Sequence, residues 1–511
     1  MTSQDPQKKL KIAVVGGGLV GSLQACYMAK RGHHVELYEL RDDIRLMEHV
    51  PGRSINLAMS IRGRSGLREV GLEDEIIKNH GLPMEARMIH RLDGSTYQIP
   101  YGKKGQCIYS VGRRFVNEVL LNAAEKLPNV HFNFAHKLVN SDLDKGTMSF
   151  KNLKSGEIVE TDADLILGTD GAYSAVRKQF MKRARFNYSQ EYIPCYYLEL
   201  CIPPTASGNF AMNPKCLHIW PRGSFMMIAL PNQDASWTVT LFMPHEKFEQ
   251  LTTPEKLIAF FQTHYPDSLP LIGKERLVKD YFATKPSGLI SVKCYPHQAG
   301  KALLMGDSAH AMVPFYGQGM NAGFEDCVVF NEFLNQYGDH NLEKVLPAYT
   351  EYRHVDAHAI CDLALYNFIE MRDLVNHFSF LARKRFDTVM HWMFPNWWVP
   401  LYTSVTFSRM RYHLICDLAL YNFIEMRDLV NRFSFLARKR FDTVMHWLFP
   451  NWWVPLYTSV TFSRMRYHLC IENKKWQDRV VRKLLWSTGT AVVATGVVAL
   501  YNFRSYLQKL F

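Results

Sequence analysis

A glycine-rich turn near the N-terminus constrains the fold of this 511-residue chain more than any other feature. The apolar strand 11–15 (KIAVV) runs directly into GGGLVG at 16–21, and a helix is predicted to follow. In this G-x-G-x-x-G pattern Gly16 permits the tight turn, Gly18 lets a pyrophosphate approach the backbone, and Gly21 lets the helix pack on the strand. The N-terminus of the helix then faces the anion. We therefore predict a Rossmann-like α/β domain that binds a dinucleotide.

A second strand, predicted at 34–39, ends at Glu39, eighteen residues after Gly21. An acidic side chain at this place would bond a ribose hydroxyl of the dinucleotide. Acidic residues at strand ends are common by chance, so it is the turn together with Glu39 that indicates a nucleotide.

Two further strand-and-turn motifs identify the kind of dinucleotide. The first is DLILGTDGAYSAVR at 164–177, and the second is LLMGDSAH at 303–310, which leads to PFYGQGMN at 314–321. Three such elements in this order resemble the single-component flavoprotein aromatic hydroxylases of the p-hydroxybenzoate hydroxylase type. The resemblance implies an α/β fold in which a Rossmann-like FAD-binding domain is interleaved with an antiparallel-sheet substrate domain.

The resemblance also assigns FAD-binding residues. Asp307 would contact the ribityl chain, and the turn at 317–321 would set a positive helix N-terminus against the reduced flavin. The residues assigned in this way are Gly16, Gly18, Leu19, Val20, Gly21, Glu39, Arg41, Ala58, Arg113, Leu138, Asp170, Asp307, Gly319, Met320 and Asn321. NADPH would bind transiently near Asp170-Gly171, so a second glycine motif is not expected.

Several other segments narrow the resemblance to those family members that hydroxylate kynurenine. These segments are RSINLA at 53–58, MEARMIH at 84–90, IPYG at 99–102, GQGMNAGFEDC at 317–327, YNFIEMR at 366–372 and PLYT at 400–403. The resemblance implies L-kynurenine, NADPH and O2 as substrates. It also implies ring hydroxylation to 3-hydroxykynurenine through a flavin C4a-hydroperoxide. The amine of the substrate activates the ring, so no catalytic protein base is expected.

Kynurenine is a zwitterion, and its carboxylate needs a cation and hydrogen-bond donors. The resemblance assigns this role to Arg87, Tyr101, Asn367 and Tyr402. The planar guanidinium of Arg87 suits a carboxylate because it can donate two parallel hydrogen bonds. Without the resemblance, Arg87 would be interpreted as an ordinary strand arginine in an ion pair or in solvent.

The organisation of the rest of the chain follows from strand and helix patterns. Strands expected at 196–201, 217–220, 225–230 and 237–242 indicate an antiparallel sheet. We expect a FAD-binding domain at 8–80, 104–182 and 290–345, a substrate domain at 81–103 and 183–289, and a C-terminal helical region at 346–414 with an amphipathic helix at 362–385.

A tandem duplication occupies the C-terminal third. Residues 360–414 recur at 415–469, and the copies differ only at His377/Arg432 and Met393/Leu448. Two nearly identical units indicate a recent duplication or an incorrectly assembled sequence rather than a solenoid. The second copy carries its own Asn422 and Tyr457, so either copy could supply the substrate clamp. We expect copy one to pack on the flavin core.

Charge and hydropathy near the C-terminus indicate a membrane anchor. Residues 484–503 contain no charge over twenty residues, enough for a helix to span about 30 Å of bilayer. Five basic residues precede the run, which favours a cytosolic catalytic part. A buried core helix is the alternative. The family resemblance implies the outer mitochondrial membrane.

The composition excludes other classes of site. The net charge is +12, but no nucleic-acid motif accompanies the basic residues, so no nucleic-acid partner is expected. The ten cysteines form no zinc-type cluster, and no metal site is expected. Two other functions stay open: a tethered flavoprotein whose pocket the duplication disrupts, acting as an uncoupled NADPH oxidase or scaffold, and a FAD-dependent reductase or halogenase.

Overall fold

A computed structural model describes residues 9–47, 56–101, 105–373, 375, 387–388, 391–392 and 399–416. All of them lie in the first of two compact units, residues 1–418. The apolar run at 484–503 and almost all of the second repeat copy lie outside the described residues. Among the helices that the structure does describe, none is both long and apolar enough to cross a membrane.

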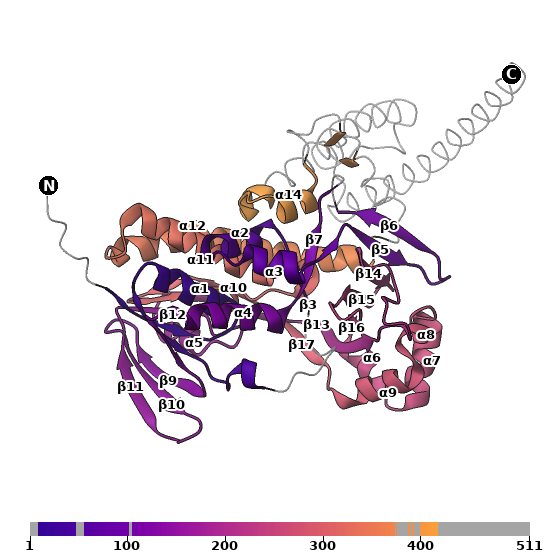
Figure 1. The fold of residues 1–511 in the computed structure, drawn as a ribbon, viewed down its shortest axis with the longest axis horizontal. Helices are drawn as coiled ribbons and strands as arrows, with labels where there is room; N and C mark the ends of the chain where they lie inside the picture. Colours follow the sequence, from indigo (N-terminus) through magenta and orange to yellow (C-terminus); the bar gives the residue numbers. More distant parts are fainter. Residues whose placement is uncertain are drawn as a thin grey trace, which may run out of the picture. The chain divides into compact units, whose positions relative to one another are not determined.

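A six-stranded sheet lies at the centre of the nucleotide-binding region (Figure 1). Its strands, in spatial order, are β18 (Gln298–Ala299), β19 (Ala302–Leu304), β12 (Leu165–Gly168), β1 (Lys11–Val15), β2 (His34–Tyr38) and β8 (Val130–Asn133). All neighbouring pairs are parallel except β18 and β19. The strands β1 and β12 read as continuous apolar runs because both faces of a parallel sheet are covered.

Helices cover one face of this sheet, and a small sheet with one helix covers the other. The first group comprises α1 (Leu19–Lys30), α2 (Ile61–Val70), α3 (Glu73–His80), α4 (Arg113–Glu125), α11 (Gly319–Tyr337) and α12 (Leu342–Arg372). On the other face lie β9 (His136–Asp142), β10 (Thr147–Asn152), β11 (Ile158–Asp162) and α5 (Ala175–Phe180). The short elements η1 (Ile44–Leu46), α10 (Asp307–His310) and η2 (Pro314–Tyr316) lie in connecting segments.

A seven-stranded, mostly antiparallel sheet forms the second region. In spatial order it contains β17 (Ser287–Tyr295), β13 (Asn187–Ile202), β16 (Trp237–Met243), β15 (Met226–Pro231), β14 (Cys216–Pro221), β5 (Ala86–His90) and β6 (Thr96–Pro100). The helices α6 (His245–Gln250), α7 (Pro254–His264), α8 (Leu269–Ile272) and α9 (Lys274–Ala283) pack on one face. A further three-stranded sheet contains β3 (Asn56–Met59), β7 (Ile108–Gly112) and β4 (Leu82–Met84). Helix α14 (Leu401–Phe407) follows α12 in the sequence.

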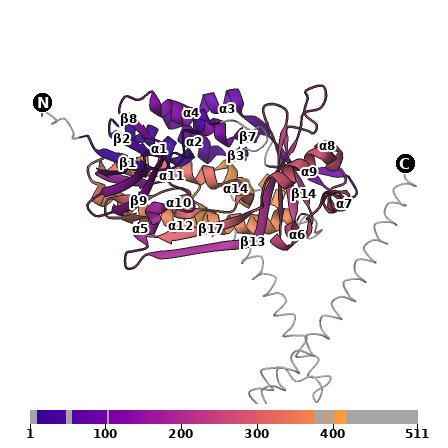
Figure 2. The ribbon, with the colours of Figure 1, turned by 90° about the horizontal axis from the view of Figure 1, so that it is seen from below.

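The sequence-based strands 196–201, 217–220, 225–230 and 237–242 all correspond to real strands. The first of them is only the end of β13, whose earlier residues pair with β17 (Figure 2). Strands β5 and β6 join this sheet although the whole of α4 to α5 separates them from β13 in the sequence. The domain boundaries given above stay a prediction, because residues 1–418 form one compact unit.

The helix predicted at 362–385 has different limits in the structure. Helix α12 begins at Leu342 and ends at Arg372, and Asp373 adopts a turn. Most of its first half lies within the helical region predicted at 346–414, but one continuous helix was not predicted there, because that half is rich in charged residues and contains Pro347. Packing against α11 stabilises that half through buried side chains such as Val345 and Tyr349.

A buried histidine in the seven-stranded sheet gives a prediction about pH. His218 Nε2 lies 3.0 Å from the Asn213 carbonyl oxygen, so Nε2 carries the proton, and Nδ1 accepts from His90 at 2.8 Å. Burial lowers the pKa of His218 to about 4, whereas an unfolded histidine titrates near ~6.5. The unfolded chain therefore binds this proton at higher pH, and the free energy of unfolding falls as the pH drops through this window, by at most roughly 3 kcal/mol.

We expect His218→Gln to make the decline in unfolding free energy between pH 6.5 and 4 shallower (the window set by these two pKa values). Glutamine retains a donor for the Asn213 carbonyl but does not titrate. Urea unfolding followed by tryptophan fluorescence at several pH values measures the slope, with His34→Gln at an exposed position as the matched control. Equal slopes in the two variants would contradict this assignment.

Candidate functional site

The glycine turn has the geometry that a pyrophosphate requires. Gly16 has a φ of +108°, and a Cβ at Gly21 would lie 1.9 Å from the Gly16 carbonyl oxygen, so neither position tolerates a side chain. A Cβ at Gly18 would instead meet nothing within 4 Å. Helix α1 begins at Leu19 without a side-chain cap, which leaves its first N–H groups available to an anion. The open space at Gly18 therefore fits the phosphates of FAD.

The Glu39 side chain contacts the backbone of this turn. Its Oε2 accepts a 2.7 Å hydrogen bond from the Gly17 N–H, and its Oε1 accepts from the backbone and the Nε of Arg41. An ionised carboxylate offers about four acceptor sites, so Glu39 can still accept from a ribose hydroxyl. The Arg41 side chain itself is largely exposed.

Asp170 lies beside the turn and has one unused acceptor. Its Oδ2 accepts from the N–H groups of Ala175 and Val176 at the start of α5, at 2.6 and 3.1 Å. Its Oδ1 is buried and has no partner among the described residues. Burial raises the pKa of this carboxyl. Because a buried acceptor without a donor is costly, Oδ1 fits a donor supplied by a ligand.

The second glycine turn positions Asp307. Gly306 has a φ of +60°, and its N–H donates to Asp326 Oδ2 at 2.7 Å. Asp307 is the first residue of α10, and its side chain is exposed, as a ribityl contact requires. Gly319 and Met320 begin α11 and offer backbone N–H groups rather than side chains.

Two of the assigned residues have a different role in the structure from the one expected for a ligand. The Asn321 side chain accepts from the Ser60 N–H at 2.9 Å and donates to the carbonyls of Ala58 and Gly317. It therefore fixes β3 to the start of α11, and only its backbone can face FAD. The Leu138 side chain is buried in the core beneath β9, so any contact with FAD must also come from its backbone.

Arg113 is the first residue of α4, and its side chain is exposed. Its charge acts on two residues of β13 that face it. Burial raises the pKa of Glu199 to about 7, and Arg113 opposes that rise. Burial also raises the pKa of Tyr197, again against the effect of Arg113. Arg113 thus lies between the flavin region and the seven-stranded sheet.

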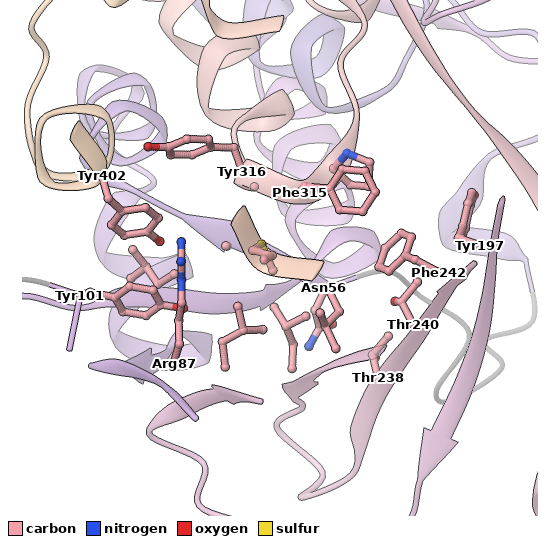
Figure 3. Close-up of a pocket in the computed structure, with 18 of the residues that line it drawn as sticks. Asn56, Arg87, Tyr101, Tyr197, Thr238, Thr240, Phe242, Phe315, Tyr316 and Tyr402 are labelled. Carbon is pink, nitrogen blue, oxygen red and sulfur yellow. The ribbon is translucent and has the colours of Figure 1, made fainter. Parts of the chain in front are cut away.

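A cavity of about 210 Å³ lies between the seven-stranded sheet, β3 and the turn at 314–317. Figure 3 shows Arg87, Tyr101 and Tyr402 at one end and Phe242, Thr238 and Thr240 at the other. The full lining comprises Asn56, Ala58, Arg87, Tyr101, Ile108, Tyr197, Leu217, Ile228, Leu230, Thr238, Thr240, Phe242, Leu289, Pro314, Phe315, Tyr316, Gly317, Met371 and Tyr402. Most of these side chains are apolar. The end that contains Arg87, Tyr101 and Tyr402 is here called the polar end.

The polar end contains a buried arginine between aromatic rings. Arg87 lies on β5, and its guanidinium carbon is 4.3 Å from the centre of the Tyr402 ring and 5.8 Å from that of Tyr101. Arg87 Nη1 donates to Glu370 Oε1 at 3.1 Å. Burial alone would lower the pKa of Arg87, but Tyr402, Glu370, Tyr101 and Tyr316 together raise it, so the guanidinium stays charged.

Two donors at this end have no acceptor among the described residues, namely Arg87 Nε and the Tyr101 hydroxyl. The Tyr101 ring stacks on that of Tyr402 at 5.3 Å, which in turn stacks on Tyr316 at 5.5 Å. Burial raises the pKa of Tyr101, so its hydroxyl keeps its proton and remains a donor. Together these groups form a cationic, donor-rich subsite.

The structure does not bring Asn367 into this subsite. Asn367 is buried in α12, and its Nδ2 donates to the Phe315 carbonyl at 2.7 Å and contacts Met371 Sδ at 3.2 Å. Its amide therefore positions the Phe315–Tyr316 wall of the pocket instead of lining it. The copies at Asn422 and Tyr457 lie outside the described residues.

Sequence reasoning missed several residues of the pocket. Glu370 lies one helical turn after Asn367 on α12, so the 3.6-residue period could have indicated it. Thr238, Thr240 and Phe242 alternate along β16, and the two-residue period of a strand could have placed them on one face. No local signal indicated which face of either element would face the pocket.

Comparisons with known proteins agree with this geometry. A family model described as "FAD binding domain" matches residues 9–364. Kynurenine 3-monooxygenase from Anopheles gambiae is 60% identical over 505 residues, covering 98% of this chain and 92% of the relative. The enzyme of that name from Sus scrofa is 52% identical over 416 residues, covering 81% of this chain and 87% of the relative.

Solved structures show the same fold at low sequence identity. The tetrameric form of 2-methyl-3-hydroxypyridine-5-carboxylic acid oxygenase has a TM-score of 0.59 and 20% identity, covering 72% of this chain and 93% of that one. The p-nitrophenol 4-monooxygenase from Pseudomonas putida DLL-E4 has a TM-score of 0.56 and 19% identity, covering 71% and 89%.

The glycine turns, the Asp170 oxygen without a donor among the described residues, and the match to the FAD-binding model define the class, a FAD-binding flavoprotein with a pocket for a small molecule. On the identity and coverage of its relatives, the chain belongs to the kynurenine 3-monooxygenase family.

We expect Gly18→Ala to weaken FAD binding at least about tenfold (~1.4 kcal/mol) while the apoprotein stays folded. Gly18 has an extended backbone that alanine can adopt, and a Cβ there meets only the space reserved for the phosphates. Flavin fluorescence quenching gives the FAD affinity, and far-ultraviolet circular dichroism reports the fold. Gly21→Ala should damage both, because its Cβ strikes backbone. FAD binding by Gly18→Ala at the affinity of the parent protein would contradict the assignment.

Proposed function

We propose that this chain is an NADPH- and FAD-dependent monooxygenase that hydroxylates L-kynurenine to 3-hydroxykynurenine. The observation that carries the proposal is a pair of buried donors at the polar end of the pocket, Arg87 Nε and the Tyr101 hydroxyl, for which the described residues supply no acceptor. Each unpaired buried donor costs about 1–3 kcal/mol. A substrate carboxylate would satisfy both and would be held by the charge of Arg87.

The rest of the pocket suits the remainder of the same molecule. Glu370 lies beside Arg87 and supplies a negative charge for the ammonium group of an amino acid. Beyond the polar end, Phe242, Phe315 and their apolar neighbours provide walls for an aromatic ring. A zwitterion with an aromatic ring therefore matches both the charge and the apolar surface of the site.

Bound FAD would accept hydride from NADPH and activate O2. The residues at 16–21, Glu39 and Asp307 would hold it. Ala58 and Gly317, which line the cavity, are among the residues that the resemblance assigns to the FAD site. The work of the protein is to orient the substrate ring and to exclude water through the apolar walls. No side chain of the pocket is needed as a strong base, because the amine of kynurenine already enriches the ring in electrons.

We further propose that the chain is tethered to a membrane, specifically the outer mitochondrial membrane, with its catalytic part in the cytosol. The twenty-residue uncharged run at 484–503 and the basic residues before it support the tether. The family resemblance supports the choice of membrane.

Copy one of the duplication is proposed to supply the clamp. Helix α12 crosses the start of copy one without a break, and Tyr402 follows Arg372, its last residue, by 402 − 372 = 30 residues. Tyr457 follows it by 457 − 372 = 85 residues. Closing the longer loop costs about 1 kcal/mol more, so the shorter connection favours Tyr402 over Tyr457 as the clamp residue.

The ratio of hydroxylated product to NADPH consumed tests the proposed activity. We expect NADPH consumption by the FAD-loaded, full-length protein to depend on L-kynurenine and to yield close to one 3-hydroxykynurenine per NADPH. Absorbance at the NADPH band and chromatography of the product give the ratio. Rapid NADPH oxidation with hydrogen peroxide and no hydroxylated product would instead favour a pocket disrupted by the duplication.

The duplication provides its own matched control. We expect Tyr402→Phe to raise the KM for L-kynurenine about tenfold, because one hydrogen bond to a carboxylate is worth ~1.5–3 kcal/mol. The same change in the same local sequence, Tyr457→Phe, should leave KM unchanged. Steady-state kinetics with saturating NADPH compare them, and a raised KM in Tyr457→Phe alone would assign the clamp to copy two.

A further inference from the structure

Residues 400–412, here called the clamp segment, carry Tyr402. Arg409, Arg411 and Tyr412 bond the C-terminal end of this segment to α11, α12 and Gln318. The contact that reaches back to the helix of Tyr402 comes from one buried arginine. Arg62 is 1% exposed and lies at the start of α2. Its Nε donates to the Val405 carbonyl at 3.2 Å, and its Nη2 donates to the Met410 carbonyl. Its guanidinium carbon lies 3.9 Å from the centre of the Tyr412 ring. One side chain thus contacts the clamp segment at three points.

The same arginine is tied to the helix that supports the flavin site. Arg62 Nη1 donates to Glu325 Oε1 at 2.6 Å, and Arg353 Nη1 donates to Glu325 Oε2 at 3.0 Å. Arg353 Nε also donates to Asp326 Oδ1 at 2.6 Å, and Asp326 accepts the Gly306 N–H. The contacts of the clamp segment therefore continue through α11 to the turn before Asp307.

The clamp segment depends on such contacts because it has little structure of its own. Helix α14 has seven residues, and an isolated helix of that length is not stable in water. Tyr402 lies one turn before Val405, whose carbonyl Arg62 holds. A shift of this short helix would move the Tyr402 ring away from Arg87, which it contacts at 4.3 Å.

We propose that Arg62 is a positioning residue for substrate binding, acting by fixing the clamp segment, and hence Tyr402, to the helices that support the flavin site. The inference rests on the proposed function, since Tyr402 is taken to contact the substrate. A lysine at this position keeps the charge opposite Glu325 but cannot form the planar fork to two carbonyls or stack in the same way on Tyr412.

The test is the dissociation constant for L-kynurenine of FAD-loaded, full-length Arg62→Lys, measured from the change in flavin absorbance. We expect a rise of about tenfold, with FAD retained and the thermal midpoint within a few degrees of the parent protein. Arg31→Lys is the matched control, because the described hydrogen bonds of Arg31 go to Asp339, Asn331 and Asn335 and none goes to the clamp segment. Equal affinity in Arg62→Lys and the parent protein would overturn the proposal.

A double-mutant cycle separates positioning from general structural damage. If Arg62 acts through Tyr402, the pair Arg62→Lys and Tyr402→Phe should bind kynurenine no more weakly than the weaker single variant. Full additivity would overturn the proposal, because Arg62 would then affect binding by another route. Absence of kynurenine binding by the parent protein would instead reject the proposed function, which keeps the two failures apart.

A second variant changes the aromatic partner of Arg62 instead of Arg62 itself, and it tests the same contact if Arg62→Lys loses FAD. Tyr412→Leu removes the ring on which Arg62 stacks and should weaken kynurenine binding several-fold while FAD is retained. The identical change in copy two, Tyr467→Leu, should have no effect. Equal weakening by both variants, or by neither, would overturn the proposal.

Discussion

The fold depends on a network of buried charges around two neighbouring carboxylates on α11. Glu325 and Asp326 are 4% and 0% exposed. Burying such groups costs several kcal/mol each unless they are paired and hydrogen-bonded. Arg353 from α12 bonds both, Arg62 from α2 bonds the first, and the Gly306 N–H bonds the second. Removing either arginine would leave the two buried carboxylates with only one buried guanidinium between them. The chain can therefore reach this state only when α2, α11, α12 and the second glycine turn are assembled together.

Local signals predicted the parts of this fold whose causes are local. The strand, glycine turn and α1 were predicted because a turn of this kind requires glycines at fixed positions. The strands of the antiparallel sheet were predicted because they are rich in Val, Ile, Phe, Tyr and Met and are separated by Pro, Gly and Asn turns. The length of α12 was not, because its first half is stabilised by packing on α11 rather than by helix propensity. The charge network was not predicted either. Its members Arg62 and Glu325 are separated by 263 residues in the sequence, and no periodicity links them.

The same distinction applies to the pocket. Arg87, Tyr101 and Tyr402 were named from motifs, and the structure brings them within contact of one another. Asn367 was named with them but points to the Phe315 carbonyl, while Glu370, three residues on, faces Arg87. A motif gives the residues of a helix in order, but only packing decides which of them meets a partner from another element.

The position of the duplication explains how the fold can contain it. Copy one is continuous with α12, and every contact given above for the clamp segment uses residues up to 412. The second copy begins at Ile415, after those residues. An insertion after residue 414 does not change the sequence separation between any two members of the charge network or of the clamp. It therefore adds no loop-closure cost to either of them. The same 55 residues inserted between Arg372 and Tyr402 would lengthen the one loop on which the clamp depends. The charge network and the pocket therefore limit the positions at which extra residues can be inserted. An insertion on the C-terminal side of the clamp segment disturbs neither of them.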